Sequence, residues 1–157
     1  MTIHVALFEP QIPANTGNIA RTCAGTGTKL HLIKPLGFST EDKMLKRAGL
    51  DYWEHVDITY HENIDKLFSS YPNADFYFLT KHGRKPHTSF NYADEERDIF
   101  FVFGKETTGL PDDVLKAHEA HCLRLPMNDK IRSLNLSNTA AILIYEALRQ
   151  QDYPNLT

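Results

Sequence analysis

Six short runs of apolar or alternating residues are spaced along the chain and predict β-strands. Runs of this length suit strands better than helices, and turn-forming or polar residues separate them. They are IHVALF (3–8), LHLI (30–33), HVDIT (55–59), DFYFLT (75–80), DIFFVF (98–103) and CLRL (122–125).

Helical patterns fill the intervals between these strands. A capping pair, Ser39 and Asp42, opens the second helix, and Gly49 is expected to end it. The last helix has one apolar stripe, with residues repeating at helical spacing from Leu136 to Leu148. The predicted helices span 18–24, 39–48, 63–70, 111–117 and 136–150. Strands alternating with helices predict an α/β fold, with a mostly parallel six-stranded sheet flanked by helices.

The length and composition predict a single globular domain over residues 1–157. The chain is 41% hydrophobic and 24% charged, which is ordinary for a globular protein. We expect no signal peptide and no membrane span, because the N-terminus lacks a basic segment and no apolar run is long enough. Cys23 and Cys122 lie far apart in the sequence, so we expect reduced thiols and a cytoplasmic protein.

The formal net charge of −3 argues against a general nucleic-acid binder. Basic residues nevertheless form three local clusters, each of which alone is typical of a solvated face. They are Lys43, Lys46 and Arg47; Lys81, His82, Arg84 and Lys85; and Lys130 and Arg132. The eight histidines are scattered, and four of them (His4, His31, His55 and His61) lie in or near strands, where core or surface roles are expected. No Cys, His or Asp group has metal-ligand spacing, so we expect no metal.

The loop GKETTGLP (104–111) follows the fifth predicted strand. Gly104 and Gly109 have the spacing of a phosphate-binding loop, but Leu110 and Pro111 stand where that motif needs Lys and Ser or Thr. An NTPase site is therefore excluded, and two turn glycines before a proline-initiated helix remain a sufficient explanation. Glu106 is the residue that a simple turn does not explain.

The segment IPANTGNIARTCAGTG (12–27) has glycines but no dinucleotide-binding spacing. Asn15 or Thr16 can cap a helix here, and Gly25 and Gly27 can end it. Asn18 and Arg21 then share one face near a helix N-terminus, where a guanidinium suits a phosphate or a developing oxyanion. The alternative is a structural ion pair of Arg21 with Glu9 or Glu106.

The segment from Leu123 to Leu148 runs from a strand through Pro126 and a polar loop into the last helix. Four polar residues, Ser133, Asn135, Ser137 and Asn138, stand at the start of that helix. A single N-cap needs one of them, so the surplus indicates either a capping cluster or a site for a small polar ligand.

Taken together, NTGNIARTCAGTG, FVFGKETTGLP and LRLPM…SLNLSN resemble the three motifs of the SPOUT (α/β-knot) RNA methyltransferases. LFEPQIPANTGNIARTCAGTG and KRAGLDYWEH are most similar to the small stand-alone TrmL/YibK type. The resemblance covers essentially the whole chain. It implies a deep trefoil knot in the C-terminal third, which periodicity alone would not indicate because knots are nearly absent from proteins.

The resemblance also implies a cofactor, S-adenosylmethionine, bound in a bent form by the knot loops. Backbone groups and apolar side chains of these loops can enclose the adenine and ribose of the cofactor. The matching positions are Leu79, Thr80, Gly104, Leu125, Met127, Ser133 and Leu134.

The implied reaction is 2′-O-methylation of a tRNA ribose, at the wobble nucleotide (cytidine or uridine 34) of leucine isoacceptors. Arg21 matches the arginine placed at the reacting ribose. We expect it to stabilise the 2′-oxyanion rather than act as a base, because arginine hardly loses its proton. Asn15, Asn18, Glu106, Ser133 and Asn135 are expected to position substrate, cofactor or Arg21.

The implied assembly is a homodimer that uses the first and last helices, and Tyr145 with the apolar stripe fits that use. Another tRNA or rRNA site is an alternative target for the methylation. A non-catalytic knotted dimer that holds RNA or a nucleotide is a second hypothesis, and a flavodoxin-like nucleotide binder is a third. Arg21 and Glu106 beside an intact SLNLSN favour the enzyme.

Overall fold

A seven-stranded parallel sheet forms the centre of the protein. The structure is a computed structural model that describes residues 2–41 and 43–157. The strand order is β3-β2-β1-β6-β4-β7-β5, and every neighbouring pair is parallel. The strands are β1 (Ile3–Phe8), β2 (Lys29–Ile33), β3 (Ile58–His61), β4 (Asp75–Leu79), β5 (Lys85–Pro86), β6 (Ile99–Phe103) and β7 (Cys122–Arg124).

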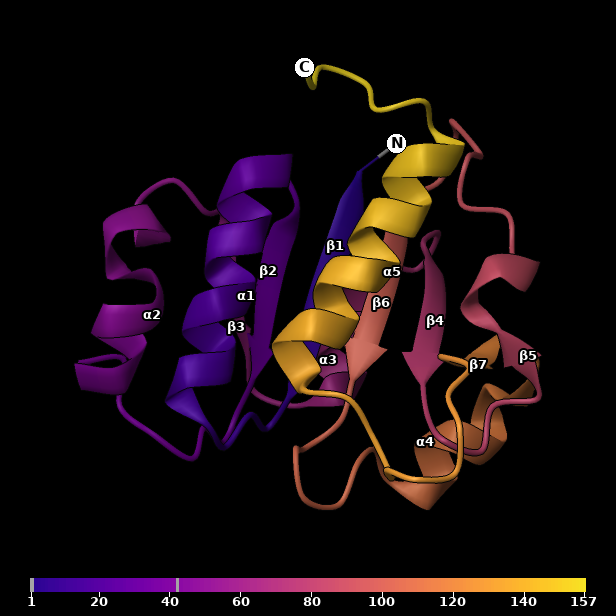
Figure 1. Cartoon of the computed structure of the whole chain (residues 1–157), viewed down its shortest axis with the longest axis horizontal. Coiled ribbons are helices and arrows are strands. Elements are labelled where there is room, and N and C mark those ends of the chain that lie inside the picture. The colour runs from indigo at the N-terminus through magenta and orange to yellow at the C-terminus, as the bar shows by residue number, and fades with distance from the viewer. Residues whose placement is uncertain (1, 42) are drawn as a thin grey trace.

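Helices cover both faces of this sheet (Figure 1). In Figure 1, α1 and α5 lie in front of the sheet, α2 lies beside α1, and α3 lies behind. The helices are α1 (Pro13–Thr26), α2 (Lys43–Trp53), α3 (Ile64–Ser70), α4 (Asp112–Ala117) and α5 (Leu136–Gln150), with short 3-10 turns at His87–Ser89 and Glu119–His121. No helix formed by the described residues is both long and apolar enough to cross a membrane.

Alternate residues of the strands supply two separate cores. On β1, Val5 and Leu7 pack with apolar residues of α1 and α5, whereas Ala6 and Phe8 pack with residues of α3 and α4. A strand buried on both faces has no polar side to mark it, which is why the central strands read as continuous apolar runs. This three-layer arrangement confirms the predicted α/β class with a parallel sheet.

The predicted count of six strands is wrong, because the sheet has a seventh, β5 (Lys85–Pro86). This strand has two residues and pairs only with β7, so it carries no apolar pattern. The third strand also begins later than predicted, at Ile58 instead of residue 55. His55 lies in the turn that closes α2, where its N–H donates to the Tyr52 carbonyl.

Two helices differ from their predicted bounds by more than one residue. The first begins at Pro13, five residues before the predicted start, because proline suits the first turn of a helix. The second was predicted over 39–48, but α2 spans Lys43–Trp53 and continues through Gly49. Its far end is held by Trp53, which packs against the core and outweighs the helix-ending tendency of glycine. Ser39 accepts a hydrogen bond from the Glu41 N–H, and Asp42, the other half of the predicted capping pair, lies outside the described residues.

Candidate functional site

The candidate site lies where the loops after β1, β6 and β7 meet at the carboxyl ends of their strands. β1 and β6 are parallel neighbours, and β4 lies between β6 and β7. Parallel strands end at the same edge of a sheet, which is the usual position of ligand sites in α/β folds. The loops carrying the three motifs are thereby brought to one edge.

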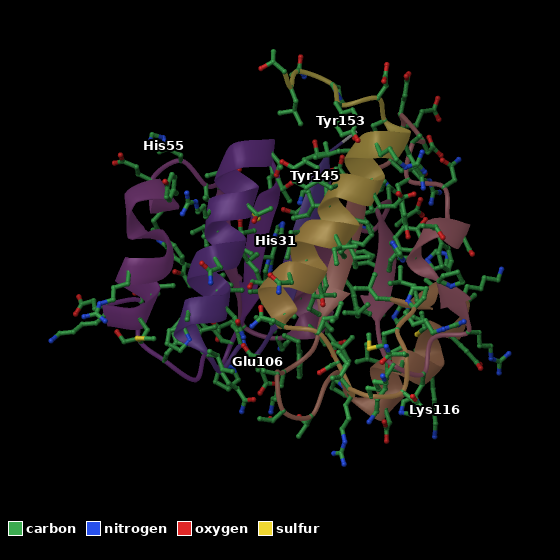
Figure 2. The ribbon with its side chains drawn as sticks, viewed as in Figure 1. His31, His55, Glu106, Lys116, Tyr145 and Tyr153 are labelled. Atoms are coloured by element: carbon green, nitrogen blue, oxygen red, sulfur yellow. The ribbon has the colours of Figure 1, made fainter. Side chains whose placement is uncertain are left out.

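Glu106 joins the loop after β6 to the start of α1 (Figure 2). Its Oε2 accepts the N–H of Gln11 at 3.0 Å, and its Oε1 accepts the N–H of Ile12 at 3.1 Å. Ile12 is the residue before the first helical turn, so the carboxylate lies at the positive end of the helix. Thr107 adds a third link by donating its hydroxyl to Gln11 Oε1 at 2.7 Å. Glu106 therefore links the second motif, in the loop after β6, to the first motif, at the start of α1.

Asn135 joins the third motif to the first. Its Oδ1 accepts the backbone N–H groups of Ser137 and Asn138, which caps α5. Its Nδ2 donates to Oδ1 of Asn15 at 3.1 Å, across 120 positions of sequence. The capping explanation is thus correct for Asn135, while the same side chain also connects two motifs.

The start of α1 corrects one prediction. Asn15 and Thr16 do not cap the helix: both lie inside it and are buried, and Ile12 is the N-cap residue. Gly27 ends the helix with a φ of +72°, as predicted, whereas Gly25 lies within it. The Glu106 carboxylate binds the N–H groups of the two residues that precede the helix, and the Asn15 amide binds Asn135.

Arg21 and Asn18 are exposed on α1, one turn apart, and Asn15 lies one further turn towards the helix start. The Arg21 guanidinium lies over the ring of Tyr52, with Cζ 4.9 Å from the ring centroid. The predicted alternative, an ion pair with Glu9 or Glu106, is not what the structure has. Glu9 pairs with Lys105 at 3.4 Å, and both Glu106 oxygens bind the backbone.

The residues matched to a cofactor site come from the three loops that follow β4, β6 and β7. Leu79, Gly104 and Leu125 each stand at or just past the end of one of three adjacent strands, β4, β6 and β7. The Thr80 N–H donates to the Leu123 carbonyl at 3.0 Å, so the loops after β4 and β7 touch. The other three are exposed residues of the segment between β7 and α5: Met127, Ser133 and Leu134. Met127 and Leu134 present apolar side chains there.

Gly104 is required by the shape of its own loop. Lys105 and Gly109 form an antiparallel bridge, and a Cβ at Gly104 would lie 2.1 Å from the Gly109 carbonyl carbon. Gly109 itself has a φ of +73°, which favours glycine. The two glycines therefore make a tight turn before α4, whose N-cap is Pro111, as the simpler interpretation held.

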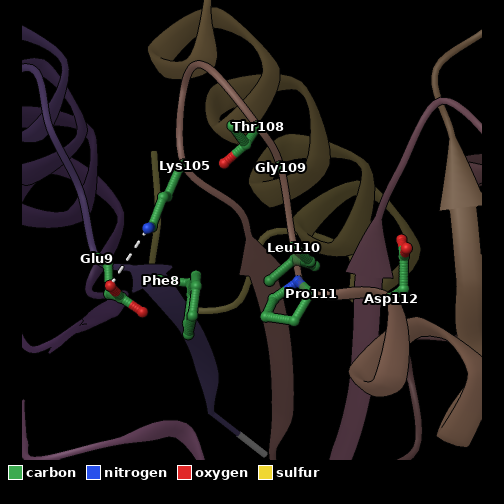
Figure 3. A pocket seen from close by; sticks show the side chains of 8 residues that line it. All are labelled: Phe8, Glu9, Lys105, Thr108, Gly109, Leu110, Pro111 and Asp112. Carbon is green, nitrogen blue, oxygen red and sulfur yellow. Dashed lines mark ion pairs between the residues drawn. The ribbon is translucent and has the colours of Figure 1, made fainter.

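A cavity of about 380 Å³ opens beside this turn (Figure 3). The Glu9–Lys105 ion pair lies at its edge, and Glu9 has a φ of +46°, which is unusual for a residue other than glycine. None of its lining residues was predicted as a catalytic or cofactor-binding residue, because a backbone angle and a contact between two loops leave no pattern in the sequence. They are Phe8, Glu9, Lys105, Thr108, Gly109, Leu110, Pro111 and Asp112.

The two thiols are unsuited to nucleophilic chemistry. Burial raises the pKa of Cys23 to about 12, and burial followed by the nearby Glu119 raises the pKa of Cys122. Both therefore stay protonated near neutral pH and pack as small apolar groups. Among residues 2–41 and 43–157, no group of three or more His, Cys, Asp or Glu side chains could hold a metal ion.

The parallel sheet and the three joined motif loops define an α/β protein with a candidate ligand site at the carboxyl edge of its sheet. The chain belongs to the SpoU rRNA Methylase family, which it matches over residues 2–145.

Individual relatives agree with this assignment. The chain is 64% identical over 156 residues to a Bacillus subtilis protein named "Putative tRNA (cytidine(34)-2'-O)-methyltransferase", covering 99% of this chain and 98% of that protein. It is 51% identical over 150 residues to the tRNA (cytidine(34)-2'-O)-methyltransferase of Methylovorus glucosotrophus, covering 95% and 96%. A solved structure described as "Structural insights into the 2-OH methylation of C/U34 on tRNA" is 39% identical, with a TM-score of 0.89 and coverage of 96% and 97%.

Proposed function

We propose that this chain methylates the ribose 2′-oxygen of nucleotide 34 in tRNA, using S-adenosylmethionine. The observation that carries the proposal is the joining of three motif loops by Glu106 and Asn135 next to the exposed Arg21. The names of the relatives support tRNA as the substrate, although the family name refers to rRNA. We extend the proposal to cytidine or uridine 34 of leucine isoacceptors, in the cytoplasm, with the whole chain as one catalytic domain.

The residues at the strand ends fit the proposed cofactor in chemistry. Leu79 and Leu125 offer apolar side chains next to backbone N–H and C=O groups at the edge of the sheet, which suits an adenosine. Met127 and Leu134, at 42% and 37% exposure, are large apolar side chains that a ligand can cover. S-adenosylmethionine, when bound, supplies an electrophilic methyl group that the 2′-oxygen takes as its proton passes to water, leaving S-adenosylhomocysteine.

Arg21 is the residue that we assign to charge stabilisation. The attacking 2′-oxygen becomes more negative as it loses its proton, and a fixed guanidinium lowers the energy of that charge. Arginine also binds phosphate through its planar set of N–H donors, so the same side chain can hold the neighbouring RNA phosphate. Asn18, one turn away, is placed to contact the same nucleotide.

Two of the basic clusters flank this edge of the sheet and support RNA binding. Lys81, Arg84 and Lys85 are exposed around the loop after β4, and Lys130 and Arg132 are exposed in the segment before α5. The end of β7, which leads into the second region, contacts the first where Arg124 donates to the Gly83 carbonyl at 3.0 Å. Phosphate contacts supply much of the affinity for RNA, so local positive charge can compensate for the acidic total.

We further propose the C-terminal knot that the resemblance implies. β7 lies between β4 and β5, although these two strands are joined directly by residues 80–84. A Cβ at Gly83 would lie 2.5 Å from the Leu123 carbonyl carbon, so the joining loop presses on the inserted strand. These contacts support a chain that passes through the loop. An experimental backbone trace in which residues 125–150 pass outside it would refute the knot.

Nucleoside mass spectrometry of tRNA from cells lacking the gene tests the function. We expect 2′-O-methylation at position 34 to disappear and to return when the gene is restored. An Arg21→Ala variant should not restore it, while its calorimetric affinity for S-adenosylmethionine should stay close to that of the wild type. Unchanged methylation at position 34 would contradict the tRNA assignment, and failure to bind the cofactor would favour a non-catalytic binding module.

A further inference from the structure

The contact between Arg21 and Tyr52 joins two helices next to the proposed site. Tyr52 is the second-last residue of α2, which packs along α1 (Figure 1). The guanidinium carbon lies 4.9 Å from the ring centroid, within the range of a cation–π interaction. Tyr52 is 37% exposed, so the pair is open to a large substrate.

The residues around Tyr52 fix its position. The next residue, Trp53, packs against the main core and anchors the end of α2. The chain then turns at once, with the His55 N–H donating to the Tyr52 carbonyl at 3.0 Å and the Val56 N–H donating to the Trp53 carbonyl at 3.2 Å. A ring mounted on this anchored helix end can restrict a side chain as long as that of arginine.

An aromatic ring holds an arginine in a different way from a carboxylate. A carboxylate engages the N–H donors at the edge of the guanidinium and neutralises its charge. A ring attracts the face of the cation, leaves the edge available, and favours the charged form. The two carboxylates predicted as partners are occupied elsewhere, Glu9 by Lys105 and Glu106 by the backbone of Gln11 and Ile12.

We propose that Tyr52 is the positioning residue for Arg21, holding its guanidinium as a fixed cation with its N–H donors free for the ribose 2′-oxygen and its phosphate. The inference rests on the proposed function, since it names the residue that orients the proposed catalytic group.

Two substitutions at Tyr52 separate the ring from the hydroxyl. Tyr52→Leu removes the ring, and we expect kcat for tRNA methylation to fall about two- to fivefold, the value of an exposed cation–π contact. Tyr52→Phe keeps the ring and should retain the wild-type kcat. Tyr60→Leu is the matched control, because Tyr60 is a comparably exposed tyrosine on β3, and it should also retain the wild-type kcat.

A spectroscopic measurement reports the position of Arg21 directly. The side-chain Hδ protons of Arg21 should show a ring-current shift in NMR spectra of the wild type and of Tyr52→Phe. Tyr52→Leu should lose that shift while its Tm and its affinity for S-adenosylmethionine stay the same. A purely structural role for Tyr52 would instead lower Tm together with activity.

The outcomes distinguish this inference from the proposed function. Wild-type kcat in Tyr52→Leu, or an equal loss in Tyr52→Phe, would overturn the positioning role, even where Arg21→Ala is inactive. Full activity of Arg21→Ala would instead overturn the role given to Arg21 in the proposed function.

Discussion

Nε2 of His31 lies 2.8 Å from Nδ1 of His4, on the neighbouring strand of the sheet, and both side chains are buried. The contact is one link in a longer chain of hydrogen bonds. On one side, His4 Nε2 lies 2.9 Å from Asp98 Oδ2, and on the other, His31 Nδ1 lies 2.9 Å from His61 Nε2. Three histidines and a carboxylate thus connect the residue before β6 through β1 and β2 to β3.

The carboxylate sets the direction of this chain. An ionised Asp98 can only accept, so His4 donates from Nε2, and its neutral ring then accepts at Nδ1. The same argument makes His31 donate from Nε2 to His4, and His61 from Nε2 to His31. All three rings are expected to be neutral with the proton on Nε2, and ¹⁵N NMR of the imidazole nitrogens checks this.

The histidine chain predicts a fold that loses stability in acid. Burial, with smaller contributions from His4 and His61, lowers the pKa of His31 to about 3, and burial also lowers the pKa of His4 and His61. In the unfolded chain these groups titrate near 6.5, so below that pH the unfolded state binds more protons. Stability is fully present above pH 6.5 and should fall towards pH 3 by about 1.4 kcal/mol per pH unit for each extra proton.

Urea unfolding between pH 8 and pH 4 measures this dependence. His31→Phe should flatten it and, because it leaves two buried nitrogens unpaired, should destabilise the protein at pH 7 by about 2 kcal/mol. His55→Gln, at an exposed histidine, should leave the curve unchanged. Equal slopes in the wild type and His31→Phe would contradict the assignment.

Asn135 performs two tasks that substitution can separate. Serine caps a helix as well as asparagine does, but its side chain is too short to reach Asn15. Asn135→Ser should therefore keep the cap but lose the bond to the buried Asn15 side chain, so methylation activity should fall about tenfold and stability by about 1 kcal/mol, the value of one such hydrogen bond. Asn135→Ala should lose activity and, because the cap is lost as well, a further amount of about 1 kcal/mol of stability. Wild-type activity in Asn135→Ser would show that the link to Asn15 is not needed.

The two glycines of the loop after β6 predict opposite responses to the same substitution. A Cβ at Gly104 has no room, so Gly104→Ala should displace the loop and abolish binding of S-adenosylmethionine in calorimetry. A Cβ at Gly109 meets nothing within 4 Å, so Gly109→Ala should cost only about 1 kcal/mol for its left-handed backbone. Unimpaired cofactor binding by Gly104→Ala would show that this loop shape is not part of the cofactor site.

The strands and the last helix could be predicted because their signals are local. Apolar runs such as that of β6 mark buried parallel strands, and the stripe of α5 fixes its face and its bounds, which the structure confirms at Leu136–Gln150. β5 could not be found this way, because two residues that pair with a distant strand have no periodicity.

The site was only partly predictable for a related reason. The motifs identified Glu106, Asn135 and Arg21, but their partners come from other parts of the chain. Glu106 contacts a backbone segment 94 or more positions away, and nothing near Arg21 in the sequence points to Tyr52. Such long-range contacts depend on how the helices pack on the sheet, which only the folded structure supplies.

The exposed face of α5 predicts a homodimer that assembles through this helix. Ile142 and Tyr145 lie three positions apart and are 40% and 49% exposed, and Figure 2 shows Tyr145 and Tyr153 towards the same end of the helix. A cavity of about 590 Å³ beside them is lined by residues of the C-terminal tail and by Gly25 of α1. Apolar side chains gathered on one face of a helix are typical of an interface.

Light scattering should therefore give twice the chain mass of 18.0 kDa at micromolar concentration. Tyr145→Glu places a charge in the proposed interface, so it should shift the mass to that of one chain and reduce methylation, because the resemblance implies sites that draw on both subunits. Tyr60→Glu, on β3, is the control and should remain dimeric. A wild type with the mass of one chain would contradict the homodimer. A Tyr145→Glu variant that stays dimeric would place the interface elsewhere.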